Sequence, residues 1–410
     1  MRVAWFGPEP SFGGGVPYVA AQILSALPAA GADVDAYVAG VSRDLEPLGA
    51  VAGVRLIREP TRWHWDRWYS RNAFLALSTG QVARLQAQRR LVRRLLEAQA
   101  RTPYDVVYQF SQIESPWSTA MARQLPPVIV HPEVHAAGEL RWHRREKNLA
   151  RRCEPLHTRM AVRAVLTART FLQRRSVRGV DAFVAPSAVF ARDLESDYRI
   201  DPSRVHVVPN PVDLDRFSPG PTPDRTHDVI ELVYVSRIAL RKGVELVVAL
   251  SHRIDDLAGA VRLRVVGDKA MFSDYRALLD DLNPAVATYE GGRSQLELAD
   301  MYRASDVLLQ PSHYEPFALT VGEALASGLP VVASDLVGAT EGVDQRACRV
   351  FESGSLDAFE AAVRGVIDDV RGGQRGALRD LARSEAERLF APHVVARQLV
   401  DVFTIVSVAG

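Results

Sequence analysis

Short apolar runs alternate with stretches of helical spacing along the whole chain. The run at 2–6 is followed by three glycines, then by apolar positions at helical spacing over 16–27, then by a second apolar run at 34–38. A strand, a loop, a helix and a strand in this order predict a parallel α/β sheet. Further strands are expected at 106–110, 128–130, 182–185 and 205–208. An exposed helix is expected at 81–99 and a strongly basic helix at 149–178.

The composition of the chain changes near residue 209. The segments 209–211 and 218–223 are rich in proline and turn-forming residues, which predicts a linker between two domains. A second series of strands and helices follows it. We therefore expect two Rossmann-like, doubly wound α/β domains whose binding crevices face each other across a cleft. The expected strands are 230–235, 262–266, 287–290, 306–310 and 330–333, and the expected helices are 243–254, 294–303, 321–326 and 393–406.

Charge and cysteine content narrow the function classes. The 410 residues include 50 Lys and Arg against 49 Asp and Glu, so no nucleic-acid partner is expected. The two cysteines, Cys153 and Cys348, lie far apart in sequence and predict neither a metal-ligand pair nor a disulfide framework, which favours a cytoplasmic location. The first residues lack the features of a signal peptide, and no run of about 18 apolar residues predicts a membrane-spanning helix.

The loop after the expected strand 306–310 carries the strongest chemical signal. Seven residues separate Glu315 on this loop from Glu323 inside the following helix, about two turns further at ~3.6 residues per turn. Two carboxylates in these positions can accept hydrogen bonds from opposite ends of an elongated polyhydroxyl ligand. Backbone N–H groups at the start of the same helix offer a site for a diphosphate. These N–H groups belong to Phe317, Ala318 and Leu319.

A second cluster of charges opens the helix expected at 243–254. Arg237 and Lys242 lie five positions apart, between a strand and this helix. Cations at a helix N-terminus are unfavourable unless an anion joins them. The pair therefore predicts binding of a phosphate-containing group, which two cations can neutralise without a metal.

With these two segments the chain resembles the retaining GT-B glycosyltransferases of family 4, the glycosyl transferases group 1. The resemblance covers most of the chain and is specific over about 205–345. It implies that Arg237 and Lys242 bind the diphosphate of a nucleotide-sugar donor. It also implies that Glu315 contacts the hydroxyls of the donor sugar and that Glu323 contacts the ribose.

The resemblance gives each predicted domain a role. Residues 1–210 would form the acceptor domain, residues 225–390 the nucleotide-sugar donor domain, and residues 391–410 a final helix that crosses back onto the first domain. The chain departs from the family pattern at Ser236 and Ala318, where the family usually has glycine. These two departures leave the detailed shape of both donor loops open.

A glycine-rich turn follows the first expected strand. Gly13, Gly14 and Gly15 would let the backbone approach a ligand closely, and the family has a pair of glycines here that closes onto the donor phosphate. The resemblance therefore implies that Gly14 and Gly15 bind the donor. It further places Gly267 and Arg293 beside the nucleotide. The alternative for the three glycines is a tight strand-to-helix turn, and the alternative for Arg293 is a surface charge.

Two histidines follow the strand expected at 128–130. The family often has a histidine on this loop near the transferred sugar, and both His131 and His135 fit, with His135 favoured; a structural role is the alternative for either. Zinc binding by the pair is not expected because no further ligand is suitably spaced. Asp213 and Asp215 resemble a metal-binding Asp-x-Asp but lie on the expected hinge. We therefore expect no metal and no cofactor beyond the nucleotide-sugar co-substrate.

The resemblance implies a hexosyltransferase-like enzyme that moves a sugar from a nucleotide diphosphate sugar, most commonly a UDP-sugar, to an unidentified hydroxyl acceptor. The acceptor is a small molecule or a glycan, the anomeric configuration is retained, and no metal is needed. The alternatives are an inverting transferase, an epimerase or a phosphorylase of the same fold, and a non-catalytic sugar-nucleotide-binding protein. The aromatic stretch 63–69 would line the acceptor site, contact a membrane or pack in the core. Trp142 and the basic run 141–145 would contact an anionic acceptor or a lipid surface.

Overall fold

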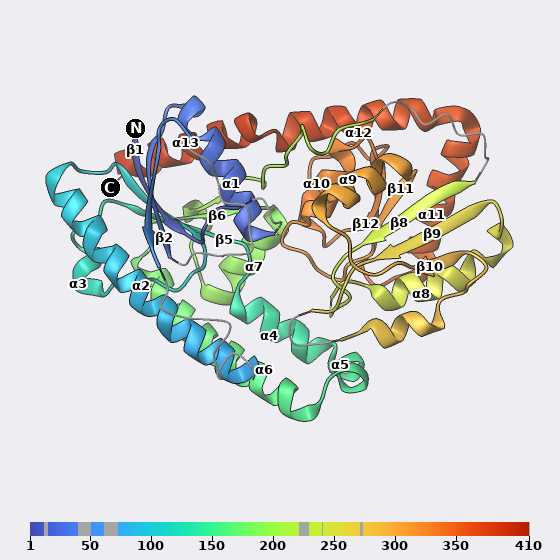
Figure 1. The fold of residues 1–410 in the computed structure, drawn as a ribbon, viewed down its shortest axis with the longest axis horizontal. Coiled ribbons are helices and arrows are strands. Elements are labelled where there is room, and N and C mark those ends of the chain that lie inside the picture. Colours follow the sequence, from blue (N-terminus) through green and yellow to red (C-terminus); the bar gives the residue numbers. More distant parts are fainter. Residues whose placement is uncertain are drawn as a thin grey trace.

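The structure is a computed structural model that describes residues 1–11, 15–39, 51–60, 73–220, 229–239, 241–270 and 274–409. It has two α/β lobes, each built on its own sheet, with the chain running from the first lobe to the second and back (Figure 1). The first sheet ends at Val207 and the second begins at Ile230, on either side of the expected linker.

The first sheet has seven strands in the order β3-β2-β1-β4-β5-β6-β7, and all its pairings are parallel. The inner strands are buried on both faces, which is why they appear in the sequence as continuous apolar runs. The strands are β1 (Arg2–Gly7), β2 (Asp33–Ala39), β3 (Val54–Glu59), β4 (Val106–Ser111), β5 (Val128–Pro132), β6 (Ala182–Ala185) and β7 (Val205–Val207).

The second sheet has six parallel strands in the order β10-β9-β8-β11-β12-β13, which repeats the arrangement of the first six strands of the other sheet. This repetition confirms the predicted pair of doubly wound α/β domains. The strands are β8 (Ile230–Val235), β9 (Val261–Val266), β10 (Ala287–Tyr289), β11 (Val307–Gln310), β12 (Val331–Ser334) and β13 (Cys348–Phe351).

Two helix predictions in the first domain were wrong in detail. The helix expected at 149–178 is two helices, because Pro155 has no N–H to donate and ends the first of them. The helix expected as exposed at 81–99 is amphipathic, since Leu91 and Leu95 are fully buried against the sheet. The helices are α1 (Val16–Ala26), α2 (Ala73–Arg101), α3 (Thr119–Ala122), α4 (Ala136–Arg145), α5 (Lys147–Cys153), α6 (Leu156–Ser176) and α7 (Ala188–Tyr198).

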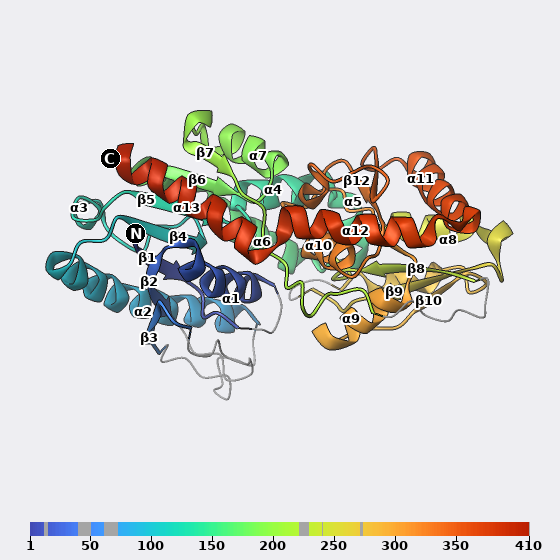
Figure 2. The same cartoon turned by 90° about the horizontal axis from the view of Figure 1, so that it is seen from above.

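The helices of the second domain end in a pair that runs across both lobes. Figure 2 shows α12 and α13 in red, one continuing the line of the other. Val395, Leu399 and Phe403 of α13 are buried in the core of the first domain, as expected for a helix that crosses back. The helices are α8 (Val244–Arg253), α9 (Gln295–Ala304), α10 (Leu319–Ala326), α11 (Leu356–Asp369), α12 (Arg375–Phe390) and α13 (Pro392–Ala409).

Among the residues that the structure describes, one helical region is long and apolar enough to cross a membrane. It covers Leu356–Val408, which includes α11, α12 and α13. The α13 part packs apolar side chains such as Leu399 and Phe403 into the first domain's core, while Ile405 and Val408 are exposed. The packing accounts for the buried apolar side chains of the helix.

Candidate active site

The donor-side residues lie where a doubly wound sheet is expected to bind ligands. In each sheet the strand order reverses at a central pair, β1 beside β4 in the first and β8 beside β11 in the second. Ligands of such sheets bind beyond the carboxyl ends of the strands at these switch points. The loop after β8 carries Arg237 and Lys242, and the loop after β11 carries Glu315.

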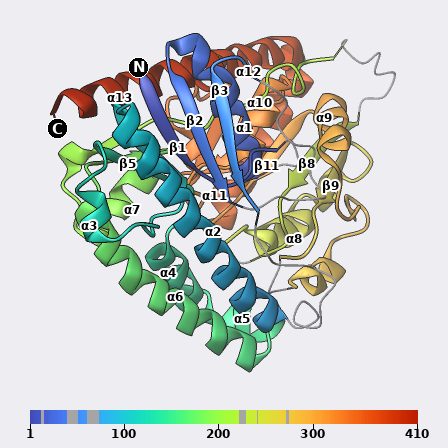
Figure 3. The same ribbon diagram turned by 60° about the vertical axis from the view of Figure 1, so that its left-hand side comes forward.

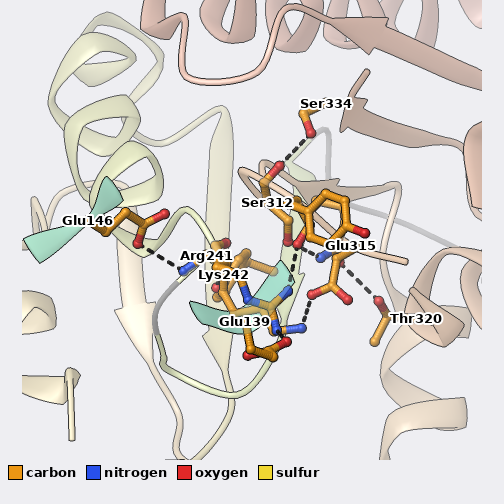
Figure 4. A network of polar contacts seen from close by, with 11 residues as sticks. Glu139, Glu146, Arg241, Lys242, Ser312, Glu315, Thr320 and Ser334 are labelled. Carbon is orange, nitrogen blue, oxygen red and sulfur yellow. Dashed lines mark hydrogen bonds and ion pairs between the residues drawn. The ribbon is translucent and has the colours of Figure 1, made fainter. Parts of the chain in front are cut away.

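Lys242 and Glu315 form an ion pair between these two loops. Their side chains are 15% and 10% exposed, and the ammonium group of Lys242 contacts the Oε1 atom of Glu315. Figure 4 shows the two side chains pointing toward each other. Burial lowers the pKa of Lys242 well below its usual range, and the charges of Arg241 and Arg237 lower it further. An anion that joined this site would favour the charged ammonium group.

Arg237 lies on the same loop as Lys242 but is exposed. Its side chain makes no hydrogen bond or ion pair with another residue in the described ranges, in contrast to Lys242. The described residues between β8 and α8 thus include three cations, of which Arg237 is exposed and Arg241 and Lys242 are partly buried. Arg237 lies close enough to Lys242 for its charge to lower the pKa of that ammonium group.

The N-terminus of α10 directly follows Glu315. Ala318 caps this helix with a φ of 80°, in the left-handed region that favours glycine, which accounts for the glycine preference of the family at this position. Phe317 is buried and its carbonyl accepts from the N–H of Ala339 at 2.8 Å. The first-turn N–H groups of a helix have no intrahelical acceptor. The N–H groups at Ala318 and Leu319 are therefore placed to bind an anion.

Glu323 lies inside α10 and is 3% exposed. Burial raises its pKa to about 7, although a hydrogen bond from the Tyr302 hydroxyl to Oε2, at 3.4 Å, and the charge of Arg216 oppose the rise. Tyr18, from α1 of the first domain, is fully buried and lies near enough for the charge of Glu323 to raise its pKa further. Glu323 is thus enclosed by side chains from both domains.

The expected nucleotide-lining positions have different surroundings. Gly267 has a φ of 151°, and a Cβ there would lie 1.7 Å from the carbonyl oxygen of Ser236, so this glycine allows the ends of β8 and β9 to meet. Arg293 is held by Glu290 at 3.1 Å. Gly15 caps α1 with a φ of 67° and open space where a Cβ would point. Gly13, Gly14 and the aromatic stretch 63–69 lie outside the described residues.

His131 lies in β5 and is completely buried. Its Nδ1 atom is hydrogen-bonded to the Tyr108 hydroxyl, and its Nε2 atom lies 3.7 Å from Glu133 Oε1. Burial lowers the pKa of His131 to about 3, so the ring is neutral at physiological pH. Burial raises the pKa of Glu133 to about 7, and Asn210 of the hinge donates a hydrogen bond to it at 2.8 Å.

His135 is the N-terminal cap of α4 and is 2% exposed. Its Nε2 atom is bonded to Asp197 Oδ2 at 2.7 Å, and its ring lies against Phe190 and Tyr198. Gly138 leaves room for the ring, since a Cβ at that position would lie 2.5 Å from it. The structure therefore places both histidines in internal contacts of the first domain, and a catalytic role for either stays a prediction.

The sequence pattern gave no reason to select Glu139, Arg241 or Glu146, and it placed Trp142 in the basic run 141–145 expected to contact an acceptor or a lipid surface. Arg241 precedes Lys242, and its contacts reach Glu139 and Glu146 of the first domain. Trp142, inside the basic run at 141–145, stacks on the ring of Tyr314, which precedes Glu315. Contacts between domains leave no local periodicity in a sequence. The sequence offered one hint, which is that some of these residues are neighbours of residues already selected.

No group of three or more His, Cys, Asp or Glu side chains that could hold a metal ion occurs among the residues that the structure describes. Asp213 instead bonds the backbone N–H groups of Asp215 and Arg216, at 3.2 and 3.0 Å. Metal independence stays a prediction.

Two family models match most of the chain. "Glycosyltransferase Family 4" matches residues 13–216, and "Glycosyl transferases group 1" matches residues 223–383. The chain belongs to glycosyltransferase family 4. The two matches meet in the expected linker and together include every strand of the two sheets except β1, which lies before residue 13.

Curated relatives agree with this assignment. The D-inositol 3-phosphate glycosyltransferase of Xylanimonas cellulosilytica is 31% identical over 308 residues, which is 67% of this chain and 71% of that protein. For six other relatives of the same name, the chain spans from 51% to 60% of their length.

Solved structures show that this family 4 protein has the GT-B fold. Sucrose-phosphate synthase from Thermosynechococcus elongatus has a TM-score of 0.70 at 19% identity, over 100% of both chains. Anabaena Alr3699/HepE, solved in complex with UDP, has a TM-score of 0.60 at 16% identity, over 99% of this chain and 100% of that one.

Proposed function

We propose that this protein transfers a sugar from a nucleotide diphosphate sugar to a hydroxyl acceptor, with retention of configuration and without a metal. The observation that carries the proposal is the Lys242–Glu315 ion pair, which lies between two loops at a switch point and next to the N-terminus of α10. A cation, a carboxylate and free helix N–H groups supply what a sugar diphosphate requires.

In this proposal the donor diphosphate replaces Glu315 as the partner of Lys242. Glu315 is then free to accept hydrogen bonds from the sugar hydroxyls. As the bond between the sugar and the diphosphate breaks, negative charge grows on the leaving phosphate oxygen. Lys242, Arg237 and the N–H groups at the start of α10 stabilise this charge, and the same oxygen takes the proton of the attacking hydroxyl. Retention follows because attack and departure share one face of the sugar.

We expect UDP as the nucleotide product, because a protein of the same fold has been solved in complex with UDP. D-inositol 3-phosphate is the first acceptor to test, because curated relatives are named for it. An inverting transferase would need a general base near the acceptor. The bond of His135 Nε2 to Asp197 inside the first domain supports the retaining route over an inverting route that would use this histidine as the base.

The test combines donor binding and donor cleavage. We expect one nucleotide sugar from a panel to raise the unfolding temperature in the presence of EDTA and to release its nucleoside diphosphate. Lys242→Ala and Glu323→Ala should lose both responses, while Asp357→Ala, an exposed change on α11, should keep them. No response of the wild type to any nucleotide sugar or nucleoside diphosphate would overturn the proposal.

Product analysis separates the alternative enzymes. The anomeric proton of the product, observed by NMR, should have the configuration of the donor; the opposite configuration would indicate an inverting transferase. Turnover that requires inorganic phosphate instead of a nucleotide would indicate a phosphorylase, and release of a free sugar epimer would indicate an epimerase. Binding without any turnover across a panel of acceptors would favour a sugar-nucleotide-binding protein.

We also propose that α6 contacts an anionic membrane surface. Four of its large apolar side chains are exposed by 52% to 65%, and the helix has five arginines and no acidic residue. It lies on the outside of the first domain, beside α2 (Figure 3). Apolar side chains among cations are the composition of a helix that lies in a membrane interface. The exposed apolar residues are Leu156, Met160, Phe171 and Leu172.

Vesicle sedimentation tests this contact. The protein should sediment with vesicles that contain phosphatidylglycerol, less so at high salt, and not with phosphatidylcholine alone. The double variant Met160→Glu, Phe171→Glu should lose the binding. Leu296→Glu is the matched control, because Leu296 is 70% exposed on α9 of the other domain. Equal binding by all three proteins would exclude α6 as the contact.

A further inference from the structure

One helix of the first domain contacts both loops that carry the donor-side charges. Trp142 of α4 stacks on Tyr314, with ring centroids 5.7 Å apart and an interplanar angle of 21°. The same ring lies over His313 at 6.4 Å and 22°. His313 and Tyr314 directly precede Glu315, so this aromatic stack fixes the backbone from which Glu315 projects.

Arg241 connects the same helix to the other loop. Its guanidinium group donates to Glu139 Oε1 at 2.8 Å and to the carbonyl oxygen of Tyr314 at 3.0 Å. Its backbone N–H donates to Glu146 Oε2 at 3.1 Å. Figure 4 shows Arg241 between the two glutamates, with Lys242 next to it. The residue before Lys242 is therefore held by side chains of the other domain.

The spacing of these three first-domain residues is that of one helix face. Glu139, Trp142 and Glu146 lie three and four positions apart, and Glu146 is the C-terminal cap of α4. Residues at this spacing project from the same side of a helix. Together these three residues form the α4 face. The α4 face thus meets the loop after β8 and the loop after β11 at the same time.

The backbone of Arg241 gives this contact a mechanical consequence. Its φ is 71°, in the left-handed region that a residue with a Cβ adopts when its surroundings hold it there. The carbonyl of Arg241 accepts from the N–H of His313 at 2.7 Å, so the two donor loops are also joined to each other. Loss of the α4 face would leave Arg241 free to relax, and Lys242 follows it directly in the chain.

We propose that Glu139, Trp142 and Glu146 are positioning residues that set Lys242 and Glu315 in their working geometry when the two domains are in contact. The inference rests on the proposed function, because the geometry matters if a sugar diphosphate binds between these loops. It assigns to α4 of the acceptor domain the task of completing a donor site whose charged groups all belong to the other domain.

The experiment is a double-mutant cycle across the domains. Glu139→Ala and Arg241→Ala should each lower kcat/KM for the donor by about 10- to 100-fold, since small displacements of catalytic groups have effects of this size. The double variant should lose no more than the stronger single variant, because both remove one interaction. Lys147→Gln, an exposed change beside Glu146, is the matched control and should keep the wild-type value.

A second comparison isolates the backbone of Arg241. Arg241→Gly and Arg241→Ala lose the same side-chain bonds, but glycine adopts a φ of 71° without strain. The glycine variant should therefore regain activity relative to the alanine variant, with little difference between their unfolding temperatures. A residue that merely supported the fold would show a change in unfolding temperature and no such recovery of kcat/KM.

The outcomes separate this inference from the proposed function. A wild-type protein that neither binds UDP in calorimetry nor releases a nucleoside diphosphate from any donor would sink the proposed function before the variants are compared. An active wild type whose Glu139→Ala, Glu139→Gln and Arg241→Ala variants keep full kcat/KM would overturn the positioning role. Losses that multiply fully in the double variant would overturn it as well, because the two residues would then act independently.

Discussion

The loops at the ends of the central strands differ sharply between the two domains, although the sheets have the same strand order. In the second domain these loops hold Lys242 and Glu315, which bond each other and retain some exposure. In the first domain His131 lies in β5 and His135 on the loop after it; their side chains are 0% and 1% exposed and are hydrogen-bonded to Tyr108 and Asp197 of their own domain. Equal topology thus places a partly exposed charged pair on one side and enclosed histidines on the other.

The difference follows from what surrounds each charged or titratable group. The side chains of His131 and His135 are 0% and 1% exposed, so their own domain encloses them. The Lys242–Glu315 pair also lies within one domain, but its side chains are 15% and 10% exposed, and in the proposed mechanism a diphosphate exchanges with the carboxylate as a partner of the ammonium group. Position at a strand end is therefore insufficient evidence for a role in binding, and the exposure of the side chain has to be considered with it.

The largest expected effect tests this contrast directly. Lys242→Met keeps most of the side chain but removes its charge, and should lower kcat by about 10² to 10³, the range for loss of one group that stabilises transition-state charge. His135→Gln should instead lower the free energy of unfolding by about 1–2 kcal/mol, through the weakened bond to Asp197, and leave kcat within a few-fold. Steady-state assays and urea unfolding measure both. A His135→Gln protein of wild-type stability and strongly reduced kcat would reverse the contrast.

The second prediction concerns two glycines with positive φ, one in a crowded place at the end of β9 and one in an open place at the start of α1. Gly267→Ala should lower the free energy of unfolding by about 3 kcal/mol, because its Cβ would overlap the Ser236 carbonyl at 1.7 Å. Gly15→Ala is the matched change in the first domain and should cost about 1 kcal/mol, because its Cβ meets open space and the positive φ is the remaining penalty. Equal losses in thermal or urea unfolding would show that the crowding at Gly267 is relieved by movement.

The sequence predicted the buried centre of each sheet well but missed one edge strand in each sheet, while the other two edge strands, β7 and β10, lie where they were expected. Central strands such as β4 and β8 are continuous apolar runs because helices cover both faces. The strands β3 and β13 were missed because they alternate arginine with apolar residues and are partly exposed. Edge strands have one open side, so polar side chains are tolerated there and the apolar signal disappears.

The donor-side charges could be selected from sequence because each lies in a local motif. Glu315 and Lys242 stand 73 positions apart, and their contact follows from the pairing of β8 with β11. The contacts of Glu139 and Glu146 with Arg241 depend on how one domain meets the other. Such contacts follow no spacing rule along the chain, so the role of the α4 face could be recognised from the arrangement of the two domains and not from the sequence.

The third prediction uses a carboxyl group from each domain. Burial raises the pKa of both Glu133 and Glu323 to about 7, against an ordinary value of 4.5. The folded state therefore binds these two protons more tightly than the unfolded state does, so the contribution of Glu133 and Glu323 to stability is largest below pH 4.5 and falls as the pH rises to about 7. Each group should contribute about 3 kcal/mol to this fall, since one pKa unit corresponds to about 1.4 kcal/mol.

Urea unfolding at pH 5 and pH 8 checks this pH dependence. Glu133→Gln and Glu323→Gln should each reduce the difference between the two pH values, and by similar amounts, because burial is the cause in both domains. Glu297→Gln is the control, since Glu297 is exposed at the start of α9. An undiminished pH difference in both variants would assign the effect to other groups.

The smallest expected effect lies at the cap of α10. Ala318 has a φ of 80°, where alanine is strained by about 1–2 kcal/mol, while glycine loses about 0.5–1 kcal/mol in unfolded-chain entropy. Ala318→Gly should therefore raise the free energy of unfolding by less than about 1 kcal/mol. Arg199, which ends α7 in the first domain with a φ of 55°, allows the same change as a comparison. If both substitutions stabilise the protein in urea unfolding and neither alters kcat more than twofold, the departure at Ala318 is a matter of backbone strain and not of donor chemistry. A loss of kcat confined to Ala318→Gly would instead show that the alanine holds the helix N–H groups in place, and the contrast between the two domains would extend to their backbones.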